Sequence, residues 1–151
     1  ADYFDESRTE DIFDYIPPKE NQPDLHPKVV VKRWWTCWEQ ENRGCFDDPG
    51  KTFLDPYMKS GLYITEIVKR LYRSEKMRQT FPDDNARLEH IFAKQVYGLP
   101  DRDHLPHCHQ LHSGFCKESR HHRPTHIRQA DTLEFAKAGT MEWELDKIFR
   151  D

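Results

Sequence analysis

Glycine and long apolar runs are scarce in this sequence. Only six of the 151 residues are Gly, and the sequence contains no Gly-rich phosphate loop, no His-Glu-x-x-His zinc motif and no Gly-x-Ser-x-Gly nucleophile motif. It also contains no apolar run of about 18 residues, the length at which a segment becomes a candidate membrane-spanning helix. We therefore expect no enzymatic activity, no resident cofactor and no transmembrane span.

Aliphatic residues are also few, while aromatic residues are frequent. Hydrophobic residues make up 36% of the chain and the mean hydropathy is -0.99, yet 13% of the residues are aromatic and ten are Pro. Aromatic side chains are enriched at protein interfaces, and prolines suit extended segments. The composition therefore favours a protein that lies along other subunits of a large hetero-oligomeric complex, with a plain small globule as the alternative.

Acidic charge is concentrated at one end of the chain. The net charge at pH 7 is -4, and the acidic excess lies in residues 1–26, which leaves the remainder mildly basic. Acids alternate with aromatic residues in this segment, which predicts an extended acidic, aromatic arm over 1–27 followed by a helical domain over 28–151. The pI of about 6.1 is well below the value above about 9 that is typical of nucleic-acid-binding domains, so nucleic acid is not an expected partner.

Apolar residues recur at helical spacing in four segments. The spacing predicts helices over 28–44, 60–81, 83–98 and 131–149, with a shorter helix within 106–117. No long period-2 run of β-branched residues indicates a strand. The predicted fold class is therefore all-α, a small helical domain with long ordered connections.

The first and last of these helices have distinctive residues. In the first, the spacing places Trp34, Cys37 and Trp38 together on the apolar face. In the last, Asp131 and Glu134 have the spacing of a capping box, and Gly139 is expected to divide the helix in two.

The four cysteines form two pairs of equal spacing, Cys37 with Cys45 and Cys108 with Cys116. A step of eight residues along a helix rises about 12 Å, so two antiparallel helices could join Cys37 to Cys116 and Cys45 to Cys108. Such bridges would stabilise a thin core by roughly 4 kcal/mol each in the chain-entropy model. Four unrelated buried thiols are the alternative, because free Cys is often buried.

This arrangement of paired cysteines resembles the coiled-coil-helix-coiled-coil-helix family of the mitochondrial intermembrane space. The resemblance covers the four cysteines. It implies structural disulfides and a non-catalytic accessory subunit of a large mitochondrial inner-membrane complex, of the respiratory chain or the ATP synthase. The protein would then lie at the periphery of the inner membrane, on its intermembrane-space side.

Seven of the nine histidines lie between His104 and His126, which raises the alternative of zinc. If 106–117 is helical, Cys108, His112 and Cys116 share one face and offer three ligands of a tetrahedral zinc site. The alternative function is then a zinc-stabilised or RNA-contacting subunit of a mitochondrial ribosome or another ribonucleoprotein, located in the matrix.

A basic segment follows the second cysteine pair. It carries four cationic residues that could contact phosphate in RNA or in anionic lipid head groups, or the acidic residues of a partner subunit: Lys117, Arg120, Arg123 and Arg128.

Overall fold

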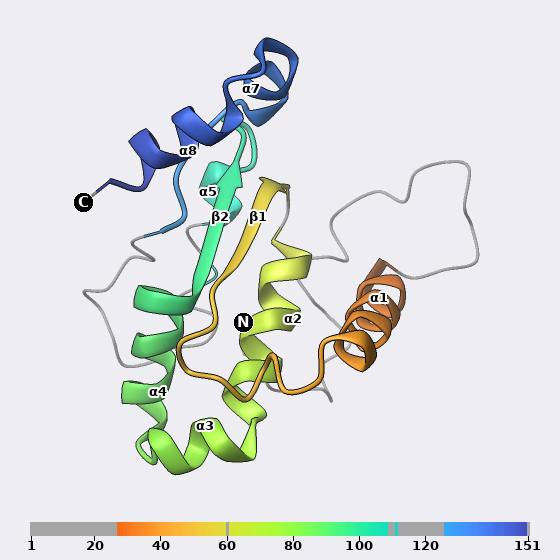
Figure 1. Ribbon diagram of the computed structural model, residues 1–151, viewed down its shortest axis with the longest axis vertical. Coiled ribbons are helices and arrows are strands. Elements are labelled where there is room, and N and C mark those ends of the chain that lie inside the picture. The colour runs from red at the N-terminus through yellow and green to blue at the C-terminus, as the bar shows by residue number, and fades with distance from the viewer. Residues whose placement is uncertain (1–26, 60, 109–110, 112–125, 151) are drawn as a thin grey trace.

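Two parallel strands, β1 (Phe53–Met58) and β2 (Val96–Pro100), lie side by side at the centre of the molecule (Figure 1). The computed structural model describes residues 27–59, 61–108, 111 and 126–150. The register pairs Phe53 with Val96 and Asp55 with Gly98, and it shifts between Asp55 and Met58. Pro56 falls within this shift, where its missing N–H removes one donor from the ladder.

The prediction of an all-α fold is therefore wrong, because the molecule is mixed α/β. The strands escaped prediction for local reasons: β1 contains Asp55 and Pro56, which are rare inside strands, and Val96 of β2 also continues the helical spacing of the residues before it. A parallel pair is formed by contacts distant in sequence, and neither strand alternates clearly between apolar and polar residues.

A third segment extends the sheet on the far side of β2. Gly98 forms a parallel bridge with Ile127, in which the Gly98 N–H donates to the His126 carbonyl over 2.9 Å. The carbonyl of Gly98 accepts from Arg128 N at 3.1 Å, and the carbonyl of Pro100 accepts from Ala130 N at 3.0 Å. β2 is therefore central, with β1 on one side and residues 126–130 on the other.

The crossover between the two strands is helical. It consists of α2 (Leu62–Arg73), α3 (Glu75–Thr80), α4 (Asp84–His90) and the π-helix η2 (Ile91–Gln95). Parallel strands require such a long connection, and this one supplies a large part of the core. The predicted apolar stripe of the second helix is confirmed by its burial: Ile64, Ile67, Val68 and Leu71.

Two predicted helices of this crossover differ from the observed ones. The predicted helix over 60–81 is divided at Ser74, whose extended backbone ends α2 while its hydroxyl accepts the Met77 N–H to begin α3. The predicted helix over 83–98 ends at Gln95. The buried Gln95 amide nitrogen donates to the Asp48 and Lys51 carbonyls, at 2.9 and 3.0 Å, and thereby fixes the loop before β1.

The first helix, α1 (Pro27–Glu41), packs against α2 through a face one residue away from the predicted one. Val31 and Trp35 are buried, whereas Trp34 is 49% exposed and Cys37 is exposed. The Trp35 ring meets the Phe46 ring edge to face, with centroids 5.8 Å apart. The prediction that Trp34 and Cys37 lie on the apolar face is therefore wrong.

The remaining helices of the described residues are α5 (Leu105–Cys108), α7 (Thr132–Ala138) and α8 (Met141–Ile148). Gly139 has a φ of 70° between α7 and α8, which confirms the predicted division. Within the residues that the structure covers, none of the helices combines the length and apolar character of a membrane span, as expected. The predicted arm over 1–27 lies outside the described residues, except that Pro27 begins α1.

Candidate functional site at the carboxyl edge of the sheet

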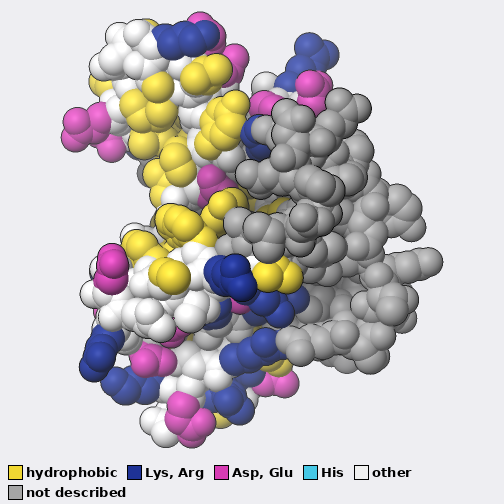
Figure 2. Space-filling model, turned by 90° about the vertical axis from the view of Figure 1, so that its right-hand side faces the viewer, with side chains coloured by type: hydrophobic (Ala, Val, Ile, Leu, Met, Phe, Trp, Pro, Cys, Tyr) yellow, Lys and Arg dark blue, Asp and Glu magenta, His cyan; other side chains and the backbone are white. Residues whose placement is uncertain are grey.

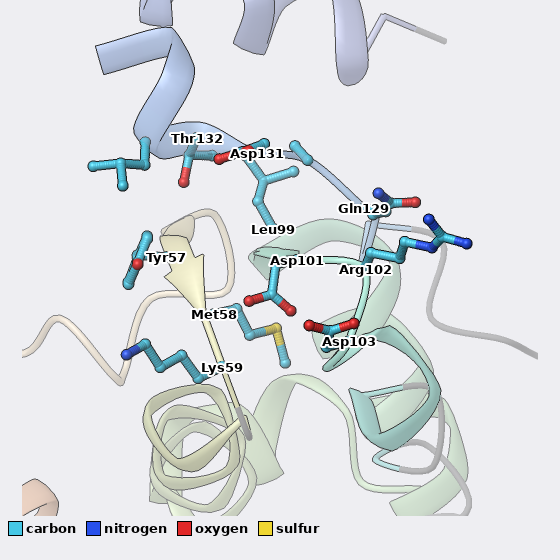
Figure 3. A pocket seen from close by; sticks show the side chains of 12 residues that line it. Tyr57, Met58, Lys59, Leu99, Asp101, Arg102, Asp103, Gln129, Asp131 and Thr132 are labelled. Carbon is cyan, nitrogen blue, oxygen red and sulfur yellow. The ribbon is translucent and has the colours of Figure 1, made fainter. Parts of the chain in front are cut away.

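A pocket of about 430 Å³ opens where β1, β2 and the segment 126–130 reach their carboxyl ends (Figure 3). In open α/β sheets, ligands bind beyond the carboxyl ends of the strands, because the loops that leave neighbouring strands diverge there. We call it the carboxyl-edge pocket, and its lining comes from three stretches of the chain: Tyr57, Met58 and Lys59; Leu99 and Asp101 to Asp103; and Gln129 to Leu133.

The apolar lining has a buried and an exposed part. Met58 and Leu99 are each 1% exposed and belong to the interior. Tyr57 and Leu133 line the same pocket but are 56% and 47% exposed. Tyr57 comes from β1 and Leu133 from the first turn of α7, so the mouth of the pocket carries two large apolar side chains from elements distant in sequence.

Asp101 fixes the loop that follows β2. Its Oδ1 accepts the His104 backbone N–H at 2.9 Å and lies 2.6 Å from His104 Nδ1. Desolvation acts to raise the pKa of Asp101, but the hydrogen bonds from the His104 side chain and backbone, together with the charge of His104, outweigh it and lower the pKa. Asp101 therefore stays ionised at neutral pH.

Two further carboxylates, those of Asp103 and Asp131, line the pocket without a hydrogen-bond or ion-pair partner among the described residues. Asp131 is the N-cap residue of α7, yet its side chain makes no capping hydrogen bond. Figure 3 shows the carboxylates of Asp101 and Asp103 near the middle of the pocket, while Lys59 and Arg102 extend to opposite sides of it. The Lys59 ammonium lies 5.2 Å from the centroid of the Tyr57 ring. The pocket therefore presents negative charge beside apolar surface.

A buried thiol and a second carboxylate lie close to this edge. Cys108 Sγ donates to the Lys59 carbonyl at 3.2 Å. Burial raises the pKa of the Cys108 thiol to about 12, and the negative charges of Asp55 and Asp101 add to the effect. Burial also raises the pKa of Asp55, although its carboxylate accepts the Tyr57 N–H. A thiol with so high a pKa stays protonated at neutral pH and is a poor nucleophile.

The predicted disulfide residues lie apart where they can be located. Cys37 is an exposed free thiol, and Cys45 and Cys108 are buried free thiols. Burial, with the negative charge of Glu39, raises the pKa of Cys45. Cys116 lies outside the described residues. The structure therefore does not join Cys45 to Cys108, and a bridge from Cys37 to Cys116 stays a prediction.

The alternative predictions of zinc and phosphate binding fall mostly on residues outside the description. Of the predicted zinc ligands, His112 and Cys116 lie outside it, and Cys108 is the buried thiol bonded to Lys59. Among the residues that are placed, no three His, Cys, Asp or Glu side chains are grouped to hold a metal ion. Both alternatives remain predictions.

Of the four predicted phosphate contacts, Arg128 alone is described, and Lys117, Arg120 and Arg123 lie outside. The Arg128 guanidinium donates to the Ile148 carbonyl and lies 5.6 Å from the centroid of the Phe149 ring. Phe149 in turn meets the Tyr97 ring edge to face, with centroids 5.2 Å apart. Arg128 therefore helps to attach the end of α8 to β2.

The two C-terminal helices, α7 and α8, form a second candidate surface that we call the C-terminal pair. No residue of α8 is buried, and Thr132 is the sole buried residue of α7. Trp143 is 62% exposed and Leu133 is 47% exposed. Figure 2 shows apolar side chains gathered in a band that runs from the upper part of the molecule, which holds α7 and α8 in Figure 1, down to its middle.

Sequence reasoning missed the carboxyl-edge pocket, because its residues come together only once the parallel pairing of β1 and β2 is known. One local signal was present: Asp101 directly follows β2, and Asp131 directly precedes α7. Comparisons with protein-family models, curated proteins and solved structures found no match to this chain. Its function must therefore be argued from the geometry of these two surfaces.

Proposed function

We propose that this protein is a non-catalytic accessory subunit that stabilises a large assembly through protein–protein contacts. The observation that carries the proposal is the C-terminal pair, in which Leu133 and Trp143 are exposed and the apolar residues of α8 at helical spacing are only half-buried: Met141, Leu145 and Ile148. An isolated helix of this length is marginal in water, and helices in proteins gain most of their stability from packing an apolar face. A partner that covers this pair would supply that packing.

The arrangement of the aromatic residues also supports the proposal. Trp143 is the most exposed large apolar side chain of the described chain, and its ring is approached by Lys147 Nζ at 4.7 Å. Trp residues in apolar patches are frequent energetic centres of interfaces. Leu133 of the C-terminal pair also lines the carboxyl-edge pocket, where it and Tyr57 are exposed. Together these residues offer a contact surface larger than one exposed side chain.

We further propose that the assembly is a complex of the mitochondrial inner membrane, of the respiratory chain or the ATP synthase, and that the protein lies on the intermembrane-space side. This finer proposal is supported by the two equally spaced cysteine pairs and their resemblance to intermembrane-space proteins. It does not depend on a Cys45–Cys108 bridge, because both of these residues are free buried thiols in the fold, and Cys108 donates to the Lys59 carbonyl.

Native gel electrophoresis of detergent-solubilised mitochondria tests the accessory role. A tagged full-length chain should migrate with a large complex. Replacing both Leu133 and Trp143 by Ser should lower the incorporated fraction at least about tenfold, because each is an anchor of the proposed contact. Val29→Ser is a matched control, since Val29 is 44% exposed but lies on α1.

Purified variants should unfold within about 0.5 kcal/mol of the wild type, because the replaced side chains are exposed. A chain that migrates alone, or a double variant that is incorporated as well as the Val29 control, would contradict the accessory role. The location is tested separately by fractionating the organelle. Recovery of the chain from the matrix, with no inner-membrane complex, would contradict the finer proposal.

A further inference from the structure

The carboxyl-edge pocket and the apolar residues at its mouth form one surface of mixed chemistry. Tyr57 and Leu133 stand at the mouth, and the interior beneath them is closed by the buried side chains of Met58 and Leu99. A volume of about 430 Å³ is within the range of pockets that receive a drug-sized group. Leu133 belongs both to the pocket lining and to α7 of the C-terminal pair, so the mouth of the pocket adjoins the exposed surface of that pair, which favours a chain segment over an isolated small molecule.

Only one of the three carboxylates of the pocket has a hydrogen-bond partner among the described residues. Asp103 and Asp131 have no partner among the residues that the structure places, and Asp101 holds its charge through its hydrogen bonds to His104. The two cations of the lining do not neutralise them: Lys59 lies over the Tyr57 ring, and Arg102 extends toward the opposite side. A ligand that brings positive charge would therefore pair with the carboxylates of Asp103 and Asp131.

We propose that the carboxyl-edge pocket is the docking site for a partner-protein segment that carries Lys or Arg beside apolar side chains. The long side chain of the basic residue lies along Tyr57 and Leu133, and its charged end meets the carboxylates of Asp103 and Asp131. Lys and Arg suit this arrangement, because their aliphatic stems pack on apolar surface while their charged ends remain with acidic groups. The inference rests on the proposed accessory role and names the chemistry of the partner.

Site-specific crosslinking tests the proposal in the full-length chain. A benzoylphenylalanine residue in place of Tyr57 is irradiated in a native extract of the cells that make the protein, and the crosslinked peptide is sequenced by mass spectrometry. The peptide should contain Lys or Arg beside apolar residues. The yield should fall as the salt concentration is raised from about 0.05 M to about 0.5 M, because salt screens exposed charges.

Charge reversal provides the matched comparison. Asp103→Lys and Asp131→Lys should each lower the yield of the crosslinked peptide at least about tenfold, because like charges then face each other. Glu41→Lys makes the same change of charge at an exposed position on α1 and should leave the yield unchanged. Circular dichroism of each variant establishes that it is folded.

The outcomes separate this inference from the proposed function. If the chain migrates within a large complex but the crosslinked peptide lacks Lys and Arg, the docking chemistry is wrong and the accessory role stands. The same holds if both reversals behave like Glu41→Lys. If the chain migrates alone and gives no crosslink, the accessory role and this inference fail together.

Discussion

The thiol of Cys108 donates a hydrogen bond to the backbone carbonyl of Lys59, with 3.2 Å between Sγ and the oxygen. This contact ties α5 to the end of β1, at the edge of the sheet where the carboxyl-edge pocket opens. The side chain of Cys108 is fully buried, whereas Cys37 on α1 is exposed. The first cysteines of the two equally spaced pairs therefore differ in exposure to solvent.

Alkylation should distinguish these thiols. At pH 8 a thiol with a pKa of about 12 is ionised in roughly one molecule in ten thousand, and the thiolate is the reactive form. Iodoacetamide should therefore modify Cys37 at least about a hundredfold faster than Cys108, as measured by peptide mass mapping. In denaturant the two rates should become equal. A peptide that links Cys45 to Cys108 in the non-reduced native protein would contradict the structure.

Replacing Asp55 by Asn should stabilise the protein at neutral pH. Burial raises the pKa of Asp55 in the folded state, so the ionised carboxylate is penalised there relative to the unfolded chain. This penalty is complete above the raised pKa and disappears as the pH falls below the ordinary value of 3.8. Asn keeps the acceptor for the Tyr57 N–H. We expect the variant to be more stable by about 1 kcal/mol at pH 7, with a smaller gain near pH 4.

Urea unfolding at the two pH values measures this difference. Asp48→Asn is the matched control, because the Asp48 carboxylate also accepts an N–H two residues along the chain, that of Gly50 at 2.8 Å, but is exposed. Its substitution should give little change in stability at either pH. An Asp55→Asn variant that is destabilised at pH 7, or whose gain is larger at pH 4, would show that burial of the charge is not the dominant effect.

The helices of this fold could be predicted from the sequence because their signals are local. Ile64, Ile67 and Leu71 lie on one face at helical spacing, and burial of that face needs no knowledge of the partner element. The face of α1 was predicted one residue out of register, because Trp34, Trp35 and Trp38 are all apolar and the spacing alone does not say which are buried. In the fold, Trp35 is the buried one, and its ring packs against the rings of Phe46 and Phe53.

The strands and the pocket could not be predicted in the same way, because both depend on pairing between distant segments. Val96 fits a helical pattern as well as a strand, and the π-helix that precedes it shifts the chain so that Gln95 reaches the loop before β1. The carboxylates of Asp101 and Asp131 face one pocket only because β2 and residues 126–130 run parallel. Amino-acid composition alone therefore does not predict a pocket at the carboxyl edge of the sheet.

Close packing across the sheet makes Gly98 sensitive to substitution. A Cβ at this position would lie 2.3 Å from Met58 Sδ and 3.0 Å from Ile127 Cδ1, so Gly98→Ala must displace side chains on both neighbouring segments. We expect a loss of about 1–3 kcal/mol in the free energy of unfolding, measured in urea.

The Met58 contact can be isolated by a double-mutant cycle. Shortening Met58 to Ala removes the nearer obstacle, so the double variant should be more stable than the sum of the single effects by about 1 kcal/mol. Strict additivity would show that the clash with Met58 does not cause the loss. An Ala substitution that is tolerated without cost would contradict the packing itself.

Arg70 should be a main link between α1 and α2. Its guanidinium donates to Glu39 Oε2 at 2.6 Å and Thr36 Oγ1 at 3.0 Å on α1, and to Glu66 Oε1 at 3.1 Å on its own helix. The bonds within α2 and to α1 use different nitrogens, so one planar group fixes the two helices relative to each other. Arg70→Met should cost about 1–2 kcal/mol, less than for a fully buried pair because Glu39 is 43% exposed.

A lysine at this position should restore little of the loss. A single ammonium does not reproduce the fork that reaches both helices, so Arg70→Lys should unfold at nearly the same urea concentration as Arg70→Met. Lys76→Met removes an exposed cation from α3 and should be neutral. The near-ultraviolet circular dichroism of Trp35, which packs against Phe46 and Phe53, should weaken in both Arg70 variants and not in the control, because α1 is then held less firmly on α2. Full recovery by Lys would mean that charge alone, and not the geometry of the guanidinium, joins the helices.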